Sequence, residues 1–332
     1  MSQIEIKKIK KFITKLNLIS IDPISIIKSG KNSKIYKINT GKKIIILKSY
    51  YGKNNTRIKK EFEFYQYLNQ ENIKNVITPI AFDFRNNFAA FPFIEGNKIK
   101  IIKKNHIVQF ANFINKINQK NKYPKKLGLA TEGIMNRKNY IEICKKRINK
   151  LQLVDKKGLI KKDFHLFLTT KIIPKFNFFK KKINDRKILN HTKYKLYKKD
   201  MIISPSDFGF NNAIVSGKKI FFFDFEYSGY DDSVKLICDF YCQPNQKVSP
   251  KLKEIFKVKI IKNYKNYKEL DYLISELLPI NYIKWCCIIL NEFLPSKLNT
   301  RKHAGQLNKN SLQVQLTKAK NYFNQNLEEY QN

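Results

Sequence analysis

Three polar side chains, Asp207, Asn212 and Asp224, lie in one stretch of the chain at spacings that fit phosphoryl transfer from a metal-bound nucleotide. In that chemistry one carboxylate accepts the proton of the attacking hydroxyl, while an amide oxygen and a second carboxylate hold Mg²⁺. Each residue alone has another explanation. Asp207 lies among turn-forming residues and could simply cap a loop, and Asn212 carries little weight in an asparagine-rich chain. Asp224 ends an apolar strand, where it either faces water or needs a partner.

The stretch 204–226 resembles the catalytic loop and metal-binding strand of the aminoglycoside phosphotransferase and choline kinase-like family. The usual family form is His-Gly-Asp, four residues and Asn, followed later by Ile-Asp-Trp/Phe-Glu. Here Asp207 and Asn212 are spaced in the same way, and the second part reads Phe-Asp224-Phe-Glu226. Pro-Ser replaces the family's His-Gly before the first Asp, which concerns the loop's geometry and the rate more than the reaction type. The resemblance implies that Asp207 is catalytic, that Asn212 and Asp224 bind magnesium, and that Glu226 assists at the metal.

Short β-rich segments upstream predict an antiparallel meander. They are residues 24–28, 34–38 and 43–48. The turn between the first two resembles the family's nucleotide-covering loop at Gly30, Asn32 and Ser33, although a plain hairpin turn would look the same. Small residues there would let backbone N–H groups approach phosphate oxygens.

The third of these segments ends in Lys48, which matches the strand lysine that holds the α- and β-phosphates in the family. Such a lysine needs a carboxylate to position it. Residues 56–69 predict a helix, and at about 100° per residue Glu61 lies in its apolar sector, whereas Glu63 points to the opposite side. We therefore expect Glu61 to pair with Lys48. The alternative is that Glu61 pairs with a neighbouring surface lysine.

Residues 76–80 and 88–93 are expected to continue the sheet. The sequence Phe-Pro-Phe-Ile-Glu-Gly at 91–96 resembles the family's hinge, where backbone groups from Phe91 to Phe93 would bind the adenine edge. The proline between them removes one donor. After Gly96 the patterns become helical.

The fold that the resemblance implies is α+β, a two-lobed protein kinase-like fold with a small antiparallel β lobe and a larger, mainly helical lobe. We place a leading helix in residues 1–20, the nucleotide-binding lobe in 21–95, and the catalytic and substrate lobe in 96–332. ATP and Mg²⁺ would bind between the lobes, and the γ-phosphoryl group would pass to an alcohol hydroxyl. The acceptor would be a small molecule such as a sugar-like or amino-alcohol metabolite.

The chain is extremely basic, with a formal net charge of +40 from 66 basic and 26 acidic residues. Such charge first suggests nucleic acid or an anionic surface. The lysines are nevertheless scattered among isoleucine and asparagine, as an AT-rich coding sequence would produce. The basic, aromatic stretch 145–199 fits a helical core stripe better than a single-strand binding surface. Two alternatives therefore stay open, namely a pseudokinase that has lost the chemistry and a basic nucleic-acid-binding protein.

The remaining features predict a soluble, cytoplasmic protein. Five cysteines without a metal-binding spacing are expected to be reduced and mostly buried, and the four histidines form no metal motif. No leading signal peptide and no membrane span is expected. Near the predicted helix 234–241, we expect Asp232 to cap the N-terminus. We expect Asp239 to lie on the helix surface, and the alternative is a carboxylate that faces the substrate.

Overall fold

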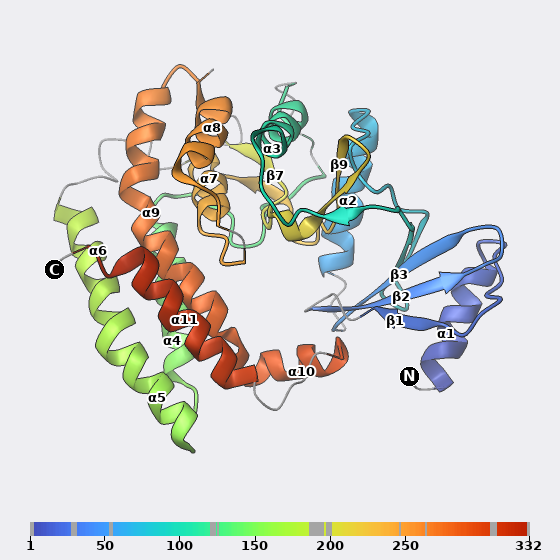
Figure 1. Cartoon of the computed structure of the whole chain (residues 1–332), viewed down its shortest axis with the longest axis horizontal. Helices are drawn as coiled ribbons and strands as arrows, with labels where there is room; N and C mark the ends of the chain where they lie inside the picture. Colours follow the sequence, from blue (N-terminus) through green and yellow to red (C-terminus); the bar gives the residue numbers. More distant parts are fainter. Residues whose placement is uncertain are drawn as a thin grey trace. The chain divides into compact units, whose positions relative to one another are not determined.

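The structure is a computed structural model that describes residues 3–27, 32–52, 56–119, 124, 126–185, 196, 201–245, 247–262, 264–305 and 311–330. Contacts divide the chain into two compact units, which are described separately below. Unit 1 consists of Met1–Lys100, Phe210–Tyr227 and Asn299–Leu307; unit 2 consists of Ile101–Gly209, Ser228–Leu298 and Asn308–Asn332. A small antiparallel sheet lies in unit 1 and most helices lie in unit 2, so the expected α+β class is confirmed (Figure 1). The domain boundaries after residues 20 and 95 stay predictions.

Unit 1 is built on a five-stranded antiparallel sheet with strand order β1-β2-β3-β5-β4. A second, three-stranded sheet has the order β6-β8-β9. The elements of unit 1 are α1 (Gln3–Thr14), β1 (Ser25–Ile27), β2 (Ser33–Asn39), β3 (Ile44–Tyr50), α2 (Thr56–Gln70), β4 (Ala81–Asp83), β5 (Phe88–Pro92), β6 (Asn97–Lys98), β8 (Ala213–Ser216) and β9 (Lys219–Phe222). The leading helix and the meander are thus present.

One predicted strand, at residues 76–80, is wrong. Val76 makes only a single bridge to Phe222, and the strand that pairs with β5 begins at Ala81. Pro79 explains the difference, because it has no N–H to donate to a ladder and restricts the residue before it. Ile80 regains the sheet by donating its N–H to the carbonyl of Ala90 at 2.7 Å.

The alternation of β3 decides which of its side chains can do chemistry. Successive residues of a strand face opposite sides of the sheet. Leu47 packs on one side in a cluster with Ile9 and Phe12 of α1. Lys48 therefore faces the other side, where α2 supplies Glu61.

Unit 2 is helical, with a two-stranded antiparallel pair of β7 and β10. Its elements are α3 (Lys104–Ile117), α4 (Asn139–Gln152), α5 (Leu159–Phe167), α6 (Ile173–Asp185), β7 (Ile202–Ser204), β10 (Gly229–Asp231), α7 (Ser233–Tyr241), α8 (Pro250–Ile261), α9 (Tyr267–Ile289), α10 (Pro295–His303, whose last part belongs to unit 1) and α11 (Ser311–Leu327). Helix α9 packs against α4, α6, α7 and α11 and forms the centre of this unit. All five cysteines are free and buried, as expected.

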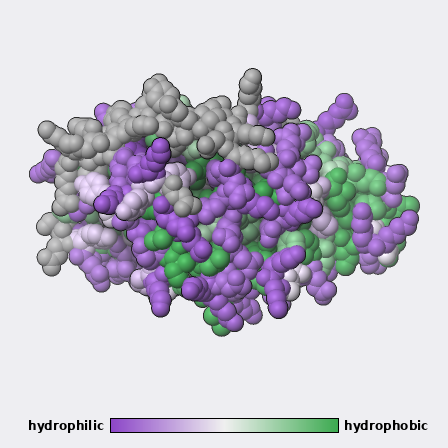
Figure 2. Space-filling view, turned by 90° about the horizontal axis from the view of Figure 1, so that it is seen from above, coloured by the Kyte–Doolittle hydropathy of each residue, from purple (hydrophilic) through white to green (hydrophobic). Residues whose placement is uncertain are grey.

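Within the described chain, one helical stretch, Tyr267–Phe293, is long and apolar enough to cross a membrane. However, 72 % of its most apolar window is buried inside the protein, as in the core helix of a soluble protein. It also carries the buried polar residues Asn281 and Lys284. Figure 2 shows a mainly hydrophilic face, with hydrophobic side chains gathered chiefly at one end. This helix is therefore weak evidence for a membrane span.

Helix α7 confirms one prediction about its acidic residues and contradicts another. Asp232 caps the helix by accepting the N–H of Val234 at 3.0 Å. Asp239, expected on the helix surface, is buried. It accepts hydrogen bonds from the ammonium of Lys284 and from the indole N–H of Trp285, the latter at 2.7 Å. A cationic partner 45 positions away in the sequence thus makes burial of this carboxylate possible.

Lys284→Met is expected to destabilise the protein by about 3 kcal/mol, because it leaves the Asp239 carboxylate buried with one cation fewer. This is the lower end of the cost of breaking a buried pair, since Lys235 still lies 3.3 Å from Asp239. Urea unfolding would measure the change. The exposed Lys268 of the same helix supplies the control, Lys268→Met, which should change stability by less than about 0.5 kcal/mol. Equal midpoints for the two variants would contradict the prediction.

The same contact should also be visible in the pH dependence of stability. Burial raises the pKa of Asp239, but Lys284 and Lys235 outweigh it and hold that pKa at about 2. The carboxyl group of an unfolded Asp has a pKa of about 3.9. The stabilisation that the charged Asp239 gains from the two lysines is therefore fully present above that pH and is lost as the pH falls towards 2. As the pH falls through this range, Lys284→Met should therefore lose less stability than the wild type does.

Candidate active site

Lys48 is the centre of the candidate site. Its Nζ lies 2.7 Å from Glu61 Oε2, 2.6 Å from Asp224 Oδ1 and 3.3 Å from Glu226 Oε2. The side chain is only 8 % exposed. The ion pair expected between Lys48 and Glu61 is therefore present, and the structure adds two carboxylates from the segment that follows β9.

Glu61 connects α2 to this segment. The residue is completely buried, and its second carboxylate oxygen accepts the backbone N–H of Phe225 at 3.1 Å. The hydroxyl of Tyr50 also donates to Glu61. Tyr50 was not predicted from the sequence, although it lies two residues after Lys48 and so faces the same side of the sheet. That spacing is the signal that could have found it.

Carboxyl groups outnumber cationic groups in the candidate site. Burial lowers the pKa of Lys48, but the carboxylates of Asp224 and Glu61 outweigh it and raise that pKa well above its usual value. The lysine therefore stays protonated. Burial raises the pKa of Glu61, and Lys48 opposes the change. Three carboxyl groups face two cations here, the ammonium of Lys48 and the guanidinium of Arg57, which lies 3.7 Å from Glu226 Oε1, so the site favours an additional cation.

Asp224 occupies a special backbone position. It lies two residues after β9 with a φ of 66°, in the left-handed region that Asp tolerates better than most residues. The N–H of Phe223 donates to the carbonyl of Asn212 at 3.1 Å, so the hairpin brings the segments of the two predicted metal ligands together. Asn212 ends one turn of 3₁₀ helix, Phe210–Asn212. The side chain of Asp224 is 37 % exposed and thus accessible to a ligand.

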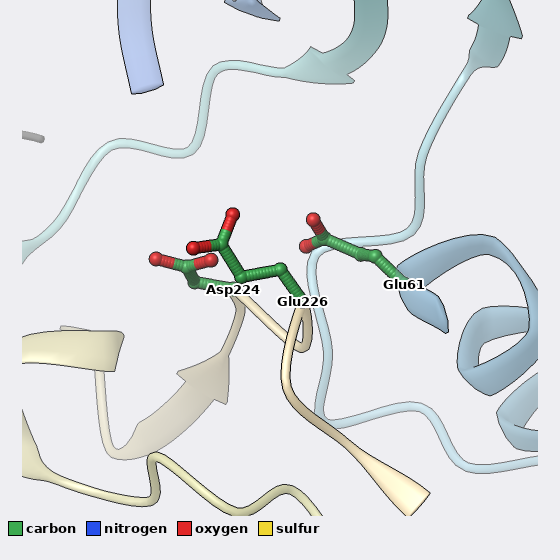
Figure 3. Close-up of side chains that lie close together, drawn as sticks. All are labelled: Glu61, Asp224 and Glu226. Carbon is green, nitrogen blue, oxygen red and sulfur yellow. The ribbon is translucent and has the colours of Figure 1, made fainter. Parts of the chain in front are cut away.

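Three carboxylates converge at this point. Glu61, Asp224 and Glu226 each offer an oxygen, and these oxygens lie within 4.8 Å of one another. Figure 3 shows Asp224 and Glu226 side by side, with Glu61 reaching towards them from the helix. Glu226 Oε2 is buried and makes no hydrogen bond to the described residues. All three carboxylates contact Lys48, but Glu61 is also bound by Tyr50 and by the N–H of Phe225, so Asp224 and Glu226 fit a divalent cation better.

Asp207 belongs to unit 2. It lies three residues after β7 and is exposed. The loop around it is ordered by local hydrogen bonds: the N–H of Ser206 donates to Ser204 Oγ, and the N–H of Phe208 donates to the carbonyl of Ser206, both at 3.0 Å. Phe208 packs against Phe110 and anchors the loop on α3.

The predicted nucleotide contacts fall on two segments of unit 1. Gly30 lies outside the described residues, while Asn32 and Ser33 mark the start of β2. Phe91 is buried. Phe93 is exposed, but its backbone N–H donates to the carbonyl of Ile44 at 3.1 Å. Of the backbone groups expected at the adenine edge, Phe93 can therefore offer only its carbonyl.

Comparison with solved structures places this geometry in a known fold. A spectinomycin phosphotransferase in complex with ADP and spectinomycin matches with a TM-score of 0.62 and 13 % identity over 94 % of this chain and 98 % of that one. Choline kinase from Cryptosporidium parvum Iowa II matches with a TM-score of 0.55 and 15 % identity, over 98 % of this chain and 99 % of that one. Plasmodium vivax ethanolamine kinase matches with a TM-score of 0.60 and 12 % identity, over 93 % of this chain and 85 % of that one.

The chain has the fold of the aminoglycoside phosphotransferases and choline kinases. The resemblance read from the sequence is therefore confirmed at the level of the fold. No protein-family model and no curated protein sequence matches the chain. The likeness to this kinase-like fold is thus one of structure, and identities of 12 to 15 % leave the activity to be argued from the site itself.

The backbone conformation bears on the departure at Ser206. Ser206 has a φ of 66°, in the left-handed region that favours glycine, and the usual family form has glycine at this position. The loop therefore keeps a glycine-type conformation with a residue that adopts it at a cost of about 1 kcal/mol.

Proposed function

We propose that this protein is an ATP-dependent phosphotransferase that moves the γ-phosphoryl group to an alcohol hydroxyl of a small molecule. The observation that carries the proposal is the contact of Lys48 with Glu61 and Asp224. The buried ammonium of Lys48 is held by Glu61 of α2 and by Asp224 after β9. Binding of both phosphate and a metal ion would explain this arrangement. Relatives in fold that are described with ADP or AMP support the nucleotide.

Each residue has a role in the proposed reaction. Lys48, positioned by Glu61, pairs with the α- and β-phosphates of ATP and thereby releases Asp224. Asp224 and Asn212, assisted by Glu226, would hold Mg²⁺, which would supply neutralisation of the phosphate charge. The turn with Gly30, Asn32 and Ser33 covers the phosphates, and the backbone at Phe91 and Phe93 contacts the adenine.

Asp207 acts on the acceptor. Its carboxylate orients the hydroxyl and takes its proton while the acceptor oxygen forms a bond to the γ-phosphorus. The bond from that phosphorus to the bridging oxygen of ADP breaks, so the products are a phosphorylated acceptor, ADP and a proton. No covalent intermediate on the protein is needed.

The acceptor we propose is a sugar-like or amino-alcohol metabolite, and the charge of the protein favours a neutral or anionic sugar-like one. A protein with a net charge of +40 repels a polycationic aminoglycoside at long range, whereas it attracts anionic nucleotides and substrates. We also propose that the protein acts in the cytoplasm.

A screen of hydroxylated metabolites for magnesium-dependent ADP release tests the proposal. We expect at least one acceptor to raise ADP release above the rate with water alone, and EDTA to abolish it. Binding of Mg-ATP without release for any acceptor would favour the pseudokinase alternative. Binding to generic DNA or RNA that falls steeply with salt, without nucleotide binding, would favour a nucleic-acid-binding protein.

A further inference from the structure

Gln243 packs against the loop that carries Asp207. Gly209 lies two residues after Asp207, and a β-carbon on it would lie 2.9 Å from the side-chain Cδ and Oε1 of Gln243 and 3.1 Å from its Nε2. The φ of Gly209 lies outside the left-handed region, so the close approach of this side chain, and not the backbone conformation, explains the glycine. Both residues belong to unit 2.

Helix α11 holds the segment that carries Gln243. The carbonyl of Cys242, the residue before it, accepts the hydroxyl of Tyr322 at 2.8 Å. Two residues after Gln243, Asn245 Oδ1 accepts a hydrogen bond from the ammonium of Lys318. Since Tyr322 and Lys318 both belong to α11, this helix fixes the chain on both sides of Gln243.

The amide group of Gln243 is buried without a matching partner. Its Nε2 has no hydrogen bond within the part of the chain that the structure describes. A buried donor without a partner is destabilising, and such a group in a native protein needs an explanation. The contact that this side chain does make is the one with Gly209, so packing on the loop is what explains its place.

The residue before Gly209 is held by another element. The ring of Phe208 lies 4.9 Å from that of Phe110 and 5.6 Å from that of Phe113, both in α3. The two residues that follow Asp207 are thus each fixed by a different part of unit 2, Phe208 by α3 and Gly209 by the segment after α7.

We propose that Gln243 is a positioning residue for Asp207. It acts through Gly209, on which its carboxamide packs, and it touches neither the nucleotide nor the acceptor. With Phe208 and Gly209 both held, the backbone that follows Asp207 has fewer conformations, so the carboxylate keeps the orientation in which it takes the acceptor's proton. The inference rests on the proposed function.

Hydrogen exchange tests the packing contact without any substrate. The N–H of Phe208 donates to the carbonyl of Ser206 at 3.0 Å, and Gln243→Ala should speed exchange of this amide by about 10-fold, because the loop opens more often. Gln243→Met keeps the length of the side chain and should exchange as the wild type does. Gln315→Ala shortens a half-buried glutamine of α11 and is the matched control, which should also leave this amide unchanged.

The rate of transfer shows whether the contact serves Asp207. With an acceptor found in the metabolite screen, Gln243→Ala should lower kcat by about 10-fold, while the KM for ATP and the affinity for Mg-ADP stay unchanged. A loss of folded protein would instead lower the number of Mg-ADP sites, which calorimetry counts. Gln243→Met should recover most of kcat.

A double-mutant cycle tests the route through Gly209. Gly209→Ala places a methyl group where the carboxamide of Gln243 lies and should lower kcat about as much as Gln243→Ala. The double variant should be no slower than either single one. Gly128→Ala, at a glycine whose β-carbon would meet no atom within 4 Å, is the control and should keep the wild-type rate.

Several results would overturn the inference. They are unchanged exchange at Phe208 in Gln243→Ala, an equal change in Gln315→Ala, and additive losses in the cycle. A Gln243→Met variant as slow as Gln243→Ala would overturn it as well, because the amide and not its packing would then be required. If the wild-type protein transfers no phosphoryl group, the proposed function falls together with this inference; if transfer occurs and Gln243→Ala keeps the full kcat, this inference alone falls.

Discussion

Asp207→Asn is expected to lower kcat by about 10²- to 10⁴-fold while Mg-ATP still binds with nearly wild-type affinity. The reason is that an amide of the same shape cannot accept the proton of the acceptor hydroxyl. The hydrogen bonds of Ser204, Ser206 and Phe208 do not use this carboxylate and should be kept in the variant. Initial rates of ADP formation and a nucleotide titration would measure the two quantities.

Asp155 supplies the matched control for this experiment. It is an exposed aspartate of unit 2 that caps a turn, since its Oδ1 accepts the N–H of Lys157 at 3.0 Å, and that pairs with Lys161 at the surface. Asp155→Asn should leave kcat unchanged. If Asp207→Asn behaves in the same way, with a small loss of stability and no loss of rate, Asp207 is a turn cap and not a catalytic residue.

Asp224→Asn is expected to weaken magnesium-dependent ATP binding by about 10- to 100-fold. The substitution removes a charged ligand of the metal and also the carboxylate that lies 2.6 Å from Lys48. Lys48 is then held mainly by Glu61 and is freer to meet phosphate, so binding of ATP in EDTA should not weaken. The prediction is therefore tested by the ratio of the ATP affinity with magnesium to the ATP affinity in EDTA, both measured by calorimetry.

The exposed Asp22 of the same unit is a suitable control, because its carboxylate accepts a hydrogen bond from Asn39 at 2.6 Å and has no part in the candidate site. Asp22→Asn should leave the magnesium dependence unchanged. An Asp224→Asn variant with an unchanged ratio would show that Asp224 is a structural partner of Lys48 and not a metal ligand.

Local sequence patterns predicted the parts of the site that local geometry controls. The resemblance to the family singled out Lys48, and the helical periodicity of α2 then selected Glu61 rather than Glu63 as its partner, because that period fixes which side chains share one face. The same holds for Asp232, whose capping role depends on the residue two positions later.

Contacts between distant segments could not be read from the sequence. Asn32 meets Tyr227 across 195 positions and Arg301 across 269, and no local period links such residues. Asp239 was misplaced for the same reason, since only the fold reveals Lys284 as its partner. The strand predicted at 76–80 was wrong for a local reason, because an apolar run was given more weight than the proline within it.

Transfer of labelled γ-phosphate from ATP tests the central claim most directly. With wild-type protein, Mg²⁺ and an acceptor found in the metabolite screen, the account predicts that the label appears on the acceptor hydroxyl in step with ADP. With Asp207→Asn the label should stay on ATP although the nucleotide still binds. Label that reaches the acceptor equally fast in both proteins, or that never leaves ATP in either, would contradict the account.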